Sequence, residues 1–188
     1  MGKIIVLFKQ SLLISAIVIL EFTLLGCAPG RVSTVPGKTS LIKSYDATVS
    51  QWKSYEDLVK WLEKDFTLDR DRYKKYEGTL PPPRSPEETL HLRSGIYIDV
   101  ATFTKETLNR INPSYKAQVA VLIVRPSRLN HYVCAFQRNG KLFVIDYGTP
   151  YQQTTGIHGP FRSLEEYRTF YVKHHPLKRS VEGIRYLP

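Results

Sequence analysis

Two residues with acid–base chemistry, His131 and Asp146, lie on either side of a predicted β-hairpin. Asn139–Gly140 between them is the strongest short hairpin signal, because the tight turn needs positive φ at both central residues. A two-residue loop at this point pairs Arg138 with Lys141. Side chains alternate along each strand, so this register places His131 and Asp146 on one face as diagonal neighbours, about 7 Å or less apart at Cβ. The sequence therefore predicts a carboxylate that orients an imidazole.

An imidazole held by a carboxylate can act as the base of a nucleophilic site, although such pairs also occur as plain structural hydrogen bonds. The segment "GIYIDVA", residues 95–101, begins a predicted helix, with Asp99 in its first turn. Tyr97 stands at the mouth of this helix, where a nucleophile would be useful. A phenol, with an ordinary pKa of about 10, is a poor nucleophile, and it would form an aryl ester as its acyl intermediate.

These residues resemble the transglutaminase-like, papain-like superfamily. Its members carry a Gly-x-Cys-x-Asp-x-Ala pattern at the start of a helix, then a histidine on the next strand and an aspartate on the strand after that. Residues 95–101 fit the pattern except at its centre, where Tyr97 replaces the cysteine, and His131 and Asp146 fit the other two positions. The resemblance covers residues 52–150. It implies a papain-like fold with a degenerate triad of Tyr97, His131 and Asp146.

Loss of the nucleophile in such a site removes several powers of ten of the rate enhancement. Two other residues are candidates to replace it. Ser94 precedes the motif, outside the helix mouth, and Cys134 points to the opposite face of the hairpin from His131, where it looks like a core residue. Either would need an irregularity such as a β-bulge to reach the histidine.

The elements that must position these residues indicate an α+β domain, with helices packed on a short antiparallel sheet. Two helix starts carry a serine followed three residues later by glutamate, a capping signature. Residues 67–84 are charged, aromatic and end in prolines, so we interpret them as a loop. The predicted helices are 54–66, a short helix from Ser85 that Gly95 ends, 97–110, and one from Ser163 to before Pro176; the predicted strands are 116–124, 131–137 and 141–147.

The N-terminus predicts export. Residues 1–26 combine a basic start, a short apolar run and small residues before a cleavage point, as a signal peptide does. "LLGC", which ends at Cys27, resembles the lipobox of bacterial lipoproteins, where the new N-terminal cysteine is acylated with fatty acids such as palmitate; a plain secreted protein is the alternative. Residues 27–50 are rich in Pro, Gly, Ser and Thr and read as a flexible tether, which leaves 51–188 as the domain.

These features predict a location and exclude some partners. Ala28 after the cysteine indicates sorting to the outer membrane of the bacterial cell envelope, with the domain facing the periplasm. With Cys27 acylated, Cys134 has no partner for a disulfide. The net charge of +10 favours anionic surfaces such as phospholipid headgroups or cell-wall polymers, or is simply a solvated positive face. Nucleic acid is not expected as a partner of an exported lipoprotein, and no metal or cofactor is expected.

Three functional hypotheses remain at this stage. The first is a catalytically silent binding or scaffold module, a pseudoenzyme that holds a protein, peptide or cell-wall ligand. The second is an active hydrolase or acyltransferase, a cysteine peptidase-like or transglutaminase-like enzyme that uses His131 and Asp146 with a non-standard nucleophile. The third is a structural lipoprotein in which the same pair only ties two strands together.

Overall fold

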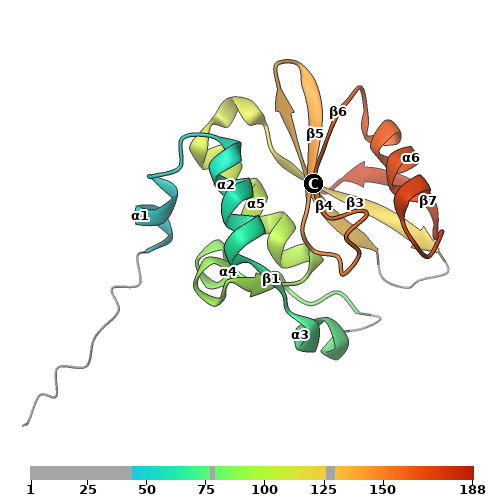
Figure 1. The fold of residues 1–188 in the computed structure, drawn as a ribbon, viewed down its shortest axis with the longest axis horizontal. Coiled ribbons are helices and arrows are strands. Elements are labelled where there is room, and N and C mark those ends of the chain that lie inside the picture. The colour runs from blue at the N-terminus through green and yellow to red at the C-terminus, as the bar shows by residue number, and fades with distance from the viewer. Residues whose placement is uncertain (1–43, 77–78, 126–129) are drawn as a thin grey trace, which may run out of the picture. The chain divides into compact units, whose positions relative to one another are not determined.

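The computed structural model describes residues 44–76, 79–125 and 130–188, which form helices on both sides of a sheet (Figure 1). The elements in chain order are α1 (Tyr45–Val49), α2 (Tyr55–Asp65), β1 (Thr67–Leu68), α3 (Arg70–Lys75), α4 (Pro86–Leu92), β2 (Ser94–Gly95), α5 (Tyr97–Ile111), the 3-10 helix η1 (Pro113–Tyr115), β3 (Gln118–Arg125), β4 (His131–Arg138), β5 (Lys141–Asp146), β6 (Gly156–Phe161), α6 (Leu164–His174) and β7 (Ser180–Tyr186).

Five strands form an antiparallel sheet in the order β6-β5-β4-β3-β7. The three central strands follow one another along the chain, and β4 and β5 are joined by a two-residue turn in which Asn139 and Gly140 both have positive φ, 51° and 69°. This is the backbone conformation that an Asn-Gly hairpin requires. A separate two-stranded parallel ladder, β1 with β2, fastens the segment before α5 to the segment after α2.

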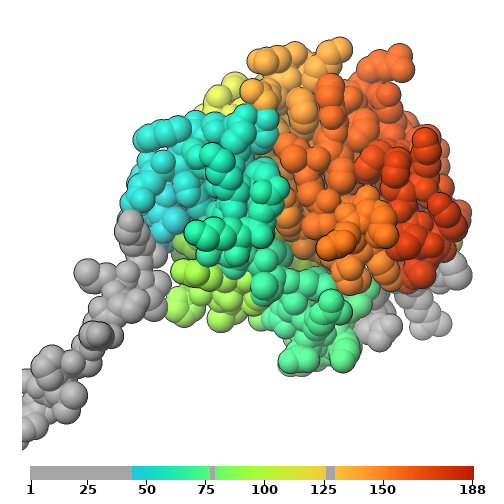
Figure 2. All heavy atoms as spheres, in the orientation of Figure 1, coloured from blue at the N-terminus to red at the C-terminus, as the bar shows by residue number. Residues whose placement is uncertain are grey.

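Different parts of the chain cover the two faces of the sheet. Helix α5 packs against β4, and together with α1 and α2 it encloses one core that includes Phe103, Phe136 and Cys134. Helix α6 lies on the other face, where Tyr167 and Tyr171 pack in a second core with side chains of β3, β4 and β5. In Figure 2 the cyan N-terminal helices and the red C-terminal segment accordingly lie on opposite sides of the orange strands.

The fold class predicted from the sequence is confirmed, as are the helices and strands around the expected site. Both capping signatures form: Ser85 Oγ accepts a hydrogen bond from Glu88 N–H at 3.1 Å, and Ser163 Oγ accepts one from Glu166 N–H at 3.3 Å. These bonds satisfy backbone donors that the first helical turn leaves without partners, so each serine sets where its helix begins.

Several local predictions were wrong. Residues 67–84 are not all loop, because Asp69 caps the short helix α3. Helix α4 ends at Leu92 and is capped by Arg93, which takes the left-handed conformation with φ 50°, so it is not Gly95 that ends the helix. The strands β6 and β7 were missed because their exposed, glycine- and arginine-containing sequences show no sustained alternation.

The predicted tether, residues 27–50, is also partly wrong. Its end forms α1, whose Tyr45 and Val49 are buried in the core on the α5 side of the sheet. The folded part therefore begins before residue 51. The predicted signal peptide and Cys27 lie outside the described residues. Among the helices that the structure describes, none has the length and apolarity needed to cross a membrane.

Candidate functional site

His131 and Asp146 form a hydrogen-bonded pair beside the β4–β5 hairpin. The strands pair in the predicted register, with Arg138 opposite Lys141, and His131 Nε2 lies 2.6 Å from Asp146 Oδ2. The other carboxylate oxygen accepts a hydrogen bond from Gly148 N–H at 3.3 Å. The prediction that the hairpin brings the carboxylate to the imidazole is confirmed. With the carboxylate on Nε2, the ring nitrogen Nδ1 is the one left for another partner.

Helix α6 covers this pair from one side. The Tyr171 ring stacks on the His131 ring with centroids 5.4 Å apart, and Tyr167 donates its hydroxyl to Asp146 Oδ2 at 3.5 Å. Burial, together with the nearby Asp146 carboxylate, raises the pKa of both tyrosines well above the ordinary phenol value. Both phenols therefore stay protonated and available as hydrogen-bond donors.

Asp99 builds the start of α5. Ile96 precedes the helix and has no polar side chain to cap it, so Asp99 Oδ2 accepts the Ile96 N–H at 3.0 Å. The same carboxylate accepts hydrogen bonds from Arg84 N–H and from Arg72 Nε, each at 2.9 Å. A Cβ on Gly95 would lie 2.8 Å from Asp99 Cβ. The glycine and aspartate of the motif therefore hold the helix mouth together and do not line the cavity.

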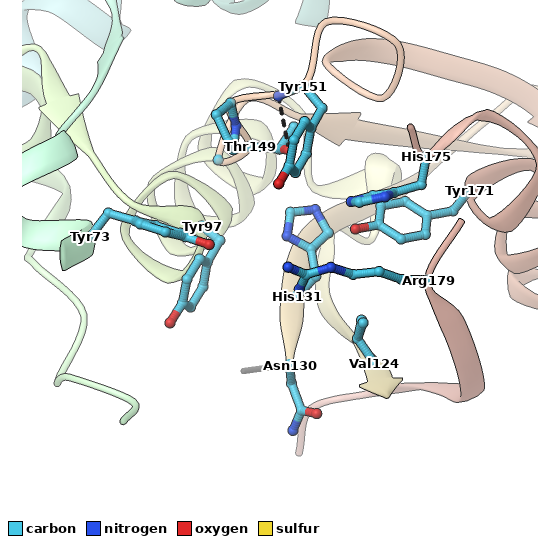
Figure 3. A pocket seen from close by; sticks show the side chains of 12 residues that line it. Tyr73, Tyr97, Val124, Asn130, His131, Thr149, Tyr151, Tyr171, His175 and Arg179 are labelled. Carbon is cyan, nitrogen blue, oxygen red and sulfur yellow. Dashed lines mark hydrogen bonds between the residues drawn. The ribbon is translucent and has the colours of Figure 1, made fainter. Parts of the chain in front are cut away.

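Tyr97 lies at this helix mouth, next to the imidazole. Its ring stacks on Tyr132 with centroids 5.6 Å apart, and its centroid is 6.4 Å from that of His131. Burial, and then the neighbouring Tyr73, raises the pKa of Tyr97 to about 12. Within the described part of the chain no hydrogen bond joins the Tyr97 hydroxyl to His131. Figure 3 shows this hydroxyl directed away from the imidazole.

Gly148 brings the chain after β5 directly onto the helix mouth. A Cβ at this position would lie 2.2 Å from Tyr97 Cα and 2.8 Å from Tyr97 N, far inside van der Waals contact. Only glycine leaves room for this approach of two backbones. The contact fixes the distance between the start of α5 and the strand that carries Asp146.

A small cavity lies among these residues, with a volume of about 30 Å³ (Figure 3). That is room for about two water molecules. Its described lining is mostly aromatic and polar: Tyr73, Tyr97, Val124, Asn130, His131, Gly148, Thr149, Pro150, Tyr151, Tyr171, His175 and Arg179. In the ranges that the structure describes, no group of three His, Cys, Asp or Glu side chains is placed to hold a metal ion.

Neither alternative nucleophile reaches the cavity. Ser94 lies in β2, where its carbonyl accepts a hydrogen bond from Arg84, and it does not line the cavity. Cys134 is fully buried in the core on the α5 face, and burial raises the pKa of its thiol. The prediction that Cys134 is a core residue is confirmed.

Three residues that sequence reasoning missed form the opposite wall of the cavity: Tyr171, His175 and Arg179. They come from α6 and from the turn that leads to β7. His175 is 2% exposed, and its ring lies 4.6 Å from that of Tyr151 and 5.1 Å from that of Tyr171, measured between centroids. No local signal marks them, because residues 139–163 separate β4 from α6, and over such a length of chain the spacing of residues does not predict contact.

Comparison with known proteins bears on the same region. A helix mouth packed against a hairpin that carries a histidine and an aspartate is the arrangement that the sequence predicts for a transglutaminase-like domain. A family model for a transglutaminase-like domain matches residues 38–159, so the chain belongs to the transglutaminase-like domain family. A search of curated proteins finds no match. The matched segment contains the helix mouth, His131 and Asp146, and it ends before α6 and β7.

Proposed function

We propose that this protein is a lipid-anchored cell-envelope protein whose transglutaminase-like domain is catalytically silent and serves to bind a ligand. The observation that carries the proposal is the state of Tyr97. It occupies the motif position that matches the family's cysteine, its pKa is raised to about 12, and no described hydrogen bond connects it to His131. A nucleophile needs a low pKa or contact with a base, and this phenol has neither.

The residue at the helix mouth supports the same conclusion. Tyr97 lines the cavity there, and its ring occupies space that a thiol would leave empty. The His131–Asp146 pair keeps a polar, oriented imidazole at the cavity. The domain thus retains a polar recess beside a residue that is a poor nucleophile.

The proposal is tested with the purified full chain and two variants. Wild-type protein should show no hydrolysis of peptide or glutamine amide bonds and no transamidation. Tyr97→Phe removes only a hydroxyl, so ligand binding and stability should be unchanged. His131→Ala should leave ligand binding largely intact, since the proposal assigns the imidazole no turnover. Turnover that iodoacetamide abolishes would contradict the silent site.

An active enzyme is the second candidate, because the His131–Asp146 pair is intact at 2.6 Å and the imidazole reaches the cavity. In that case His131 acts as acid or base on a bound substrate or on water. Turnover that falls by several powers of ten in His131→Ala would support this candidate. Loss in Tyr97→Phe as well would identify the phenol as part of that chemistry. A fall in stability alone, with no ligand found, would favour a purely structural role.

The anchor is proposed from the sequence around Cys27, which resembles a lipobox. Cells that express the full chain should incorporate an alkyne-tagged palmitate analogue into the protein, and the labelled protein should fractionate with the outer membrane. Cys27→Ala should abolish the label and the fractionation. The matched control is Cys134→Ala, which changes the other cysteine of the chain and should keep both. Equal labelling of wild type and Cys27→Ala would refute the anchor.

A further inference from the structure

The part of the chain beyond the family match supplies one wall of the cavity. Residues 38–159 match the transglutaminase-like family, whereas α6, the turn after it and β7 follow that segment. From there come Tyr171, His175 and Arg179, which face His131 across the cavity (Figure 3). The wall opposite the helix mouth therefore comes from residues that lie outside the matched segment.

His175 presents a neutral imidazole to the cavity. Its Nδ1 accepts a hydrogen bond from Leu177 N–H at 3.2 Å, which requires that this nitrogen carry no proton. The proton of the neutral ring is then on Nε2. Burial, with the positive charge of Arg179 next in effect, lowers the pKa of His175 to about 4, so the ring stays neutral at pH 7. In the described structure no protein group accepts the Nε2 proton.

Arg179 supplies the positive charge of the same wall. Figure 3 shows its side chain extending across the cavity toward His131. It is half-buried, and among the described residues no carboxylate lies within ion-pair distance of it. Asp146 does not serve as its partner, because that carboxylate is already occupied by His131, Gly148 N–H and Tyr167.

We propose that Arg179 and His175 bind a carboxylate group of the ligand. The inference deepens the proposed binding function and rests on it. Arg179 offers N–H donors in a planar fork that matches the two oxygens of a carboxylate, and His175 offers one more donor beside it. A cavity with room for about two waters has room for those two oxygens. One negative charge balances Arg179, the single Lys or Arg among the described lining residues.

The carboxylate can be the C-terminus of a peptide or that of a small free acid, and two probes separate these sources. The tripeptide N-acetyl-Ala-Ala-Ala with a free C-terminus is compared with its C-terminal amide, which has the same shape without the charge. Acetate is the second probe. Titration calorimetry of the full chain at pH 7 and low salt should show the acid binding at least about tenfold more tightly than the amide, as a charge-assisted hydrogen bond predicts. Acetate binding equal to that of the peptide assigns the small-acid source.

Two variants assign the effect to Arg179. Arg179→Gln should weaken binding of the acid about tenfold or more and leave the amide unchanged. The matched control is Arg162→Gln, which removes the same charge from a side chain that is 87% exposed and does not line the cavity, and it should bind like wild type. Equal binding of acid and amide, no binding of the acid or acetate at 10 mM (roughly −2.7 kcal/mol), or an unchanged Arg179→Gln would overturn the carboxylate site. Any of these outcomes leaves the silent reaction centre to its own test, which is turnover.

Discussion

The two sides of the cavity differ in how their polar groups are partnered. We call the side formed by Tyr97 and Gly148 the α5 wall, and the side formed by Tyr171, His175 and Arg179 the C-terminal wall. Behind the α5 wall, Asp99 is fully buried and shares its carboxylate among three protein partners, and in the wall itself the backbone of Gly148 touches that of Tyr97. On the C-terminal wall, Arg179 and one nitrogen of His175 face the cavity without a described protein partner. The buried polar groups behind the helix mouth bond to one another, whereas we propose that those of the C-terminal wall bind a ligand.

This difference shows which residues of the segment 95–101 have a structural role. Gly95 and Asp99 are needed to begin α5 and to tie it to Arg72 and Arg84, whatever residue stands at position 97. The glycine and aspartate of the sequence pattern therefore indicate the fold and not a catalytic activity. Chemistry depends on the residue at the helix mouth and on the segment that closes the cavity from the other side.

The largest expected effect comes from behind the α5 wall. Asp99→Ala leaves Arg72 half-buried without its anion and the Ile96 and Arg84 N–H groups without an acceptor. We expect a loss of about 3–5 kcal/mol in the free energy of unfolding, as for breaking one partner of a buried ion pair. The control Asp46→Ala breaks an exposed pair with Arg110 and should cost less than about 1 kcal/mol. Urea denaturation measures both, and equal effects would contradict the structural role of this wall.

Gly148→Ala should cause the next largest loss of stability. A Cβ that lies 2.2 Å from Tyr97 Cα forces the two backbones apart, and we expect a loss of about 3 kcal/mol in unfolding free energy. Gly183→Ala is the matched control, because a Cβ there meets nothing within 4 Å. It should change stability by less than about 1 kcal/mol. If Gly148→Ala is as well tolerated as the control, the close approach at the helix mouth does not constrain the fold.

The next largest effect concerns the C-terminal wall, where His175 should make the free energy of unfolding depend on pH. The unfolded chain protonates this histidine below about pH 6.5, whereas the folded chain does so only below about 4. Between these values the unfolded state binds more protons, so the contribution of His175 to stability is complete above pH 6.5 and is lost as the pH falls to 4. From pH 7 to pH 5 the loss is about 2 kcal/mol.

His175→Asn keeps an acceptor for Leu177 N–H and cannot titrate. The free energy of unfolding of this variant should therefore fall less steeply between pH 7 and pH 5 than that of wild type, by about 2 kcal/mol. Denaturation curves at both pH values give the two slopes. Identical slopes would show that the buried ring is not held neutral by the fold.

The smallest effect is expected where the two walls meet. Tyr167→Phe removes the hydroxyl that donates to Asp146 over a long 3.5 Å contact. Since the carboxylate keeps His131 and Gly148 N–H, the loss in unfolding free energy should be about 0.5–1 kcal/mol. A loss above about 3 kcal/mol, as for a buried charge left unpaired, would mean that Asp146 depends on α6 far more than its hydrogen bonds indicate.

The sequence predicts well those features that depend on residues close together along the chain. The Asn139–Gly140 turn fixes the hairpin register, and that register alone brings His131 to Asp146. Serine–glutamate spacing likewise locates two helix starts, because the capping bonds span three residues. The positions that came out wrong, such as the left-handed Arg93 at the end of α4, depend on tertiary contacts that outweigh local preference.

The residues of the C-terminal wall could not be predicted from the sequence. Its members have no motif of their own, and β7 pairs with β3, to which it has no sequence proximity. The charge of Arg179 also gave no sign of its role, since most of the chain's 27 lysines and arginines belong to the described surface or to ion pairs there. Which lysine or arginine side chain faces a cavity depends on the tertiary fold.

The pairing of β7 with β3 has a consequence for how the cavity can be altered. The five residues from His175 to Arg179 are held at both ends, by α6 on one side and by a strand of the sheet on the other. Substitutions within these five residues change no residue of the β4–β5 hairpin or of the helix mouth. One wall of the cavity can therefore be redesigned in a single short segment while the sequence of the opposite wall stays as it is.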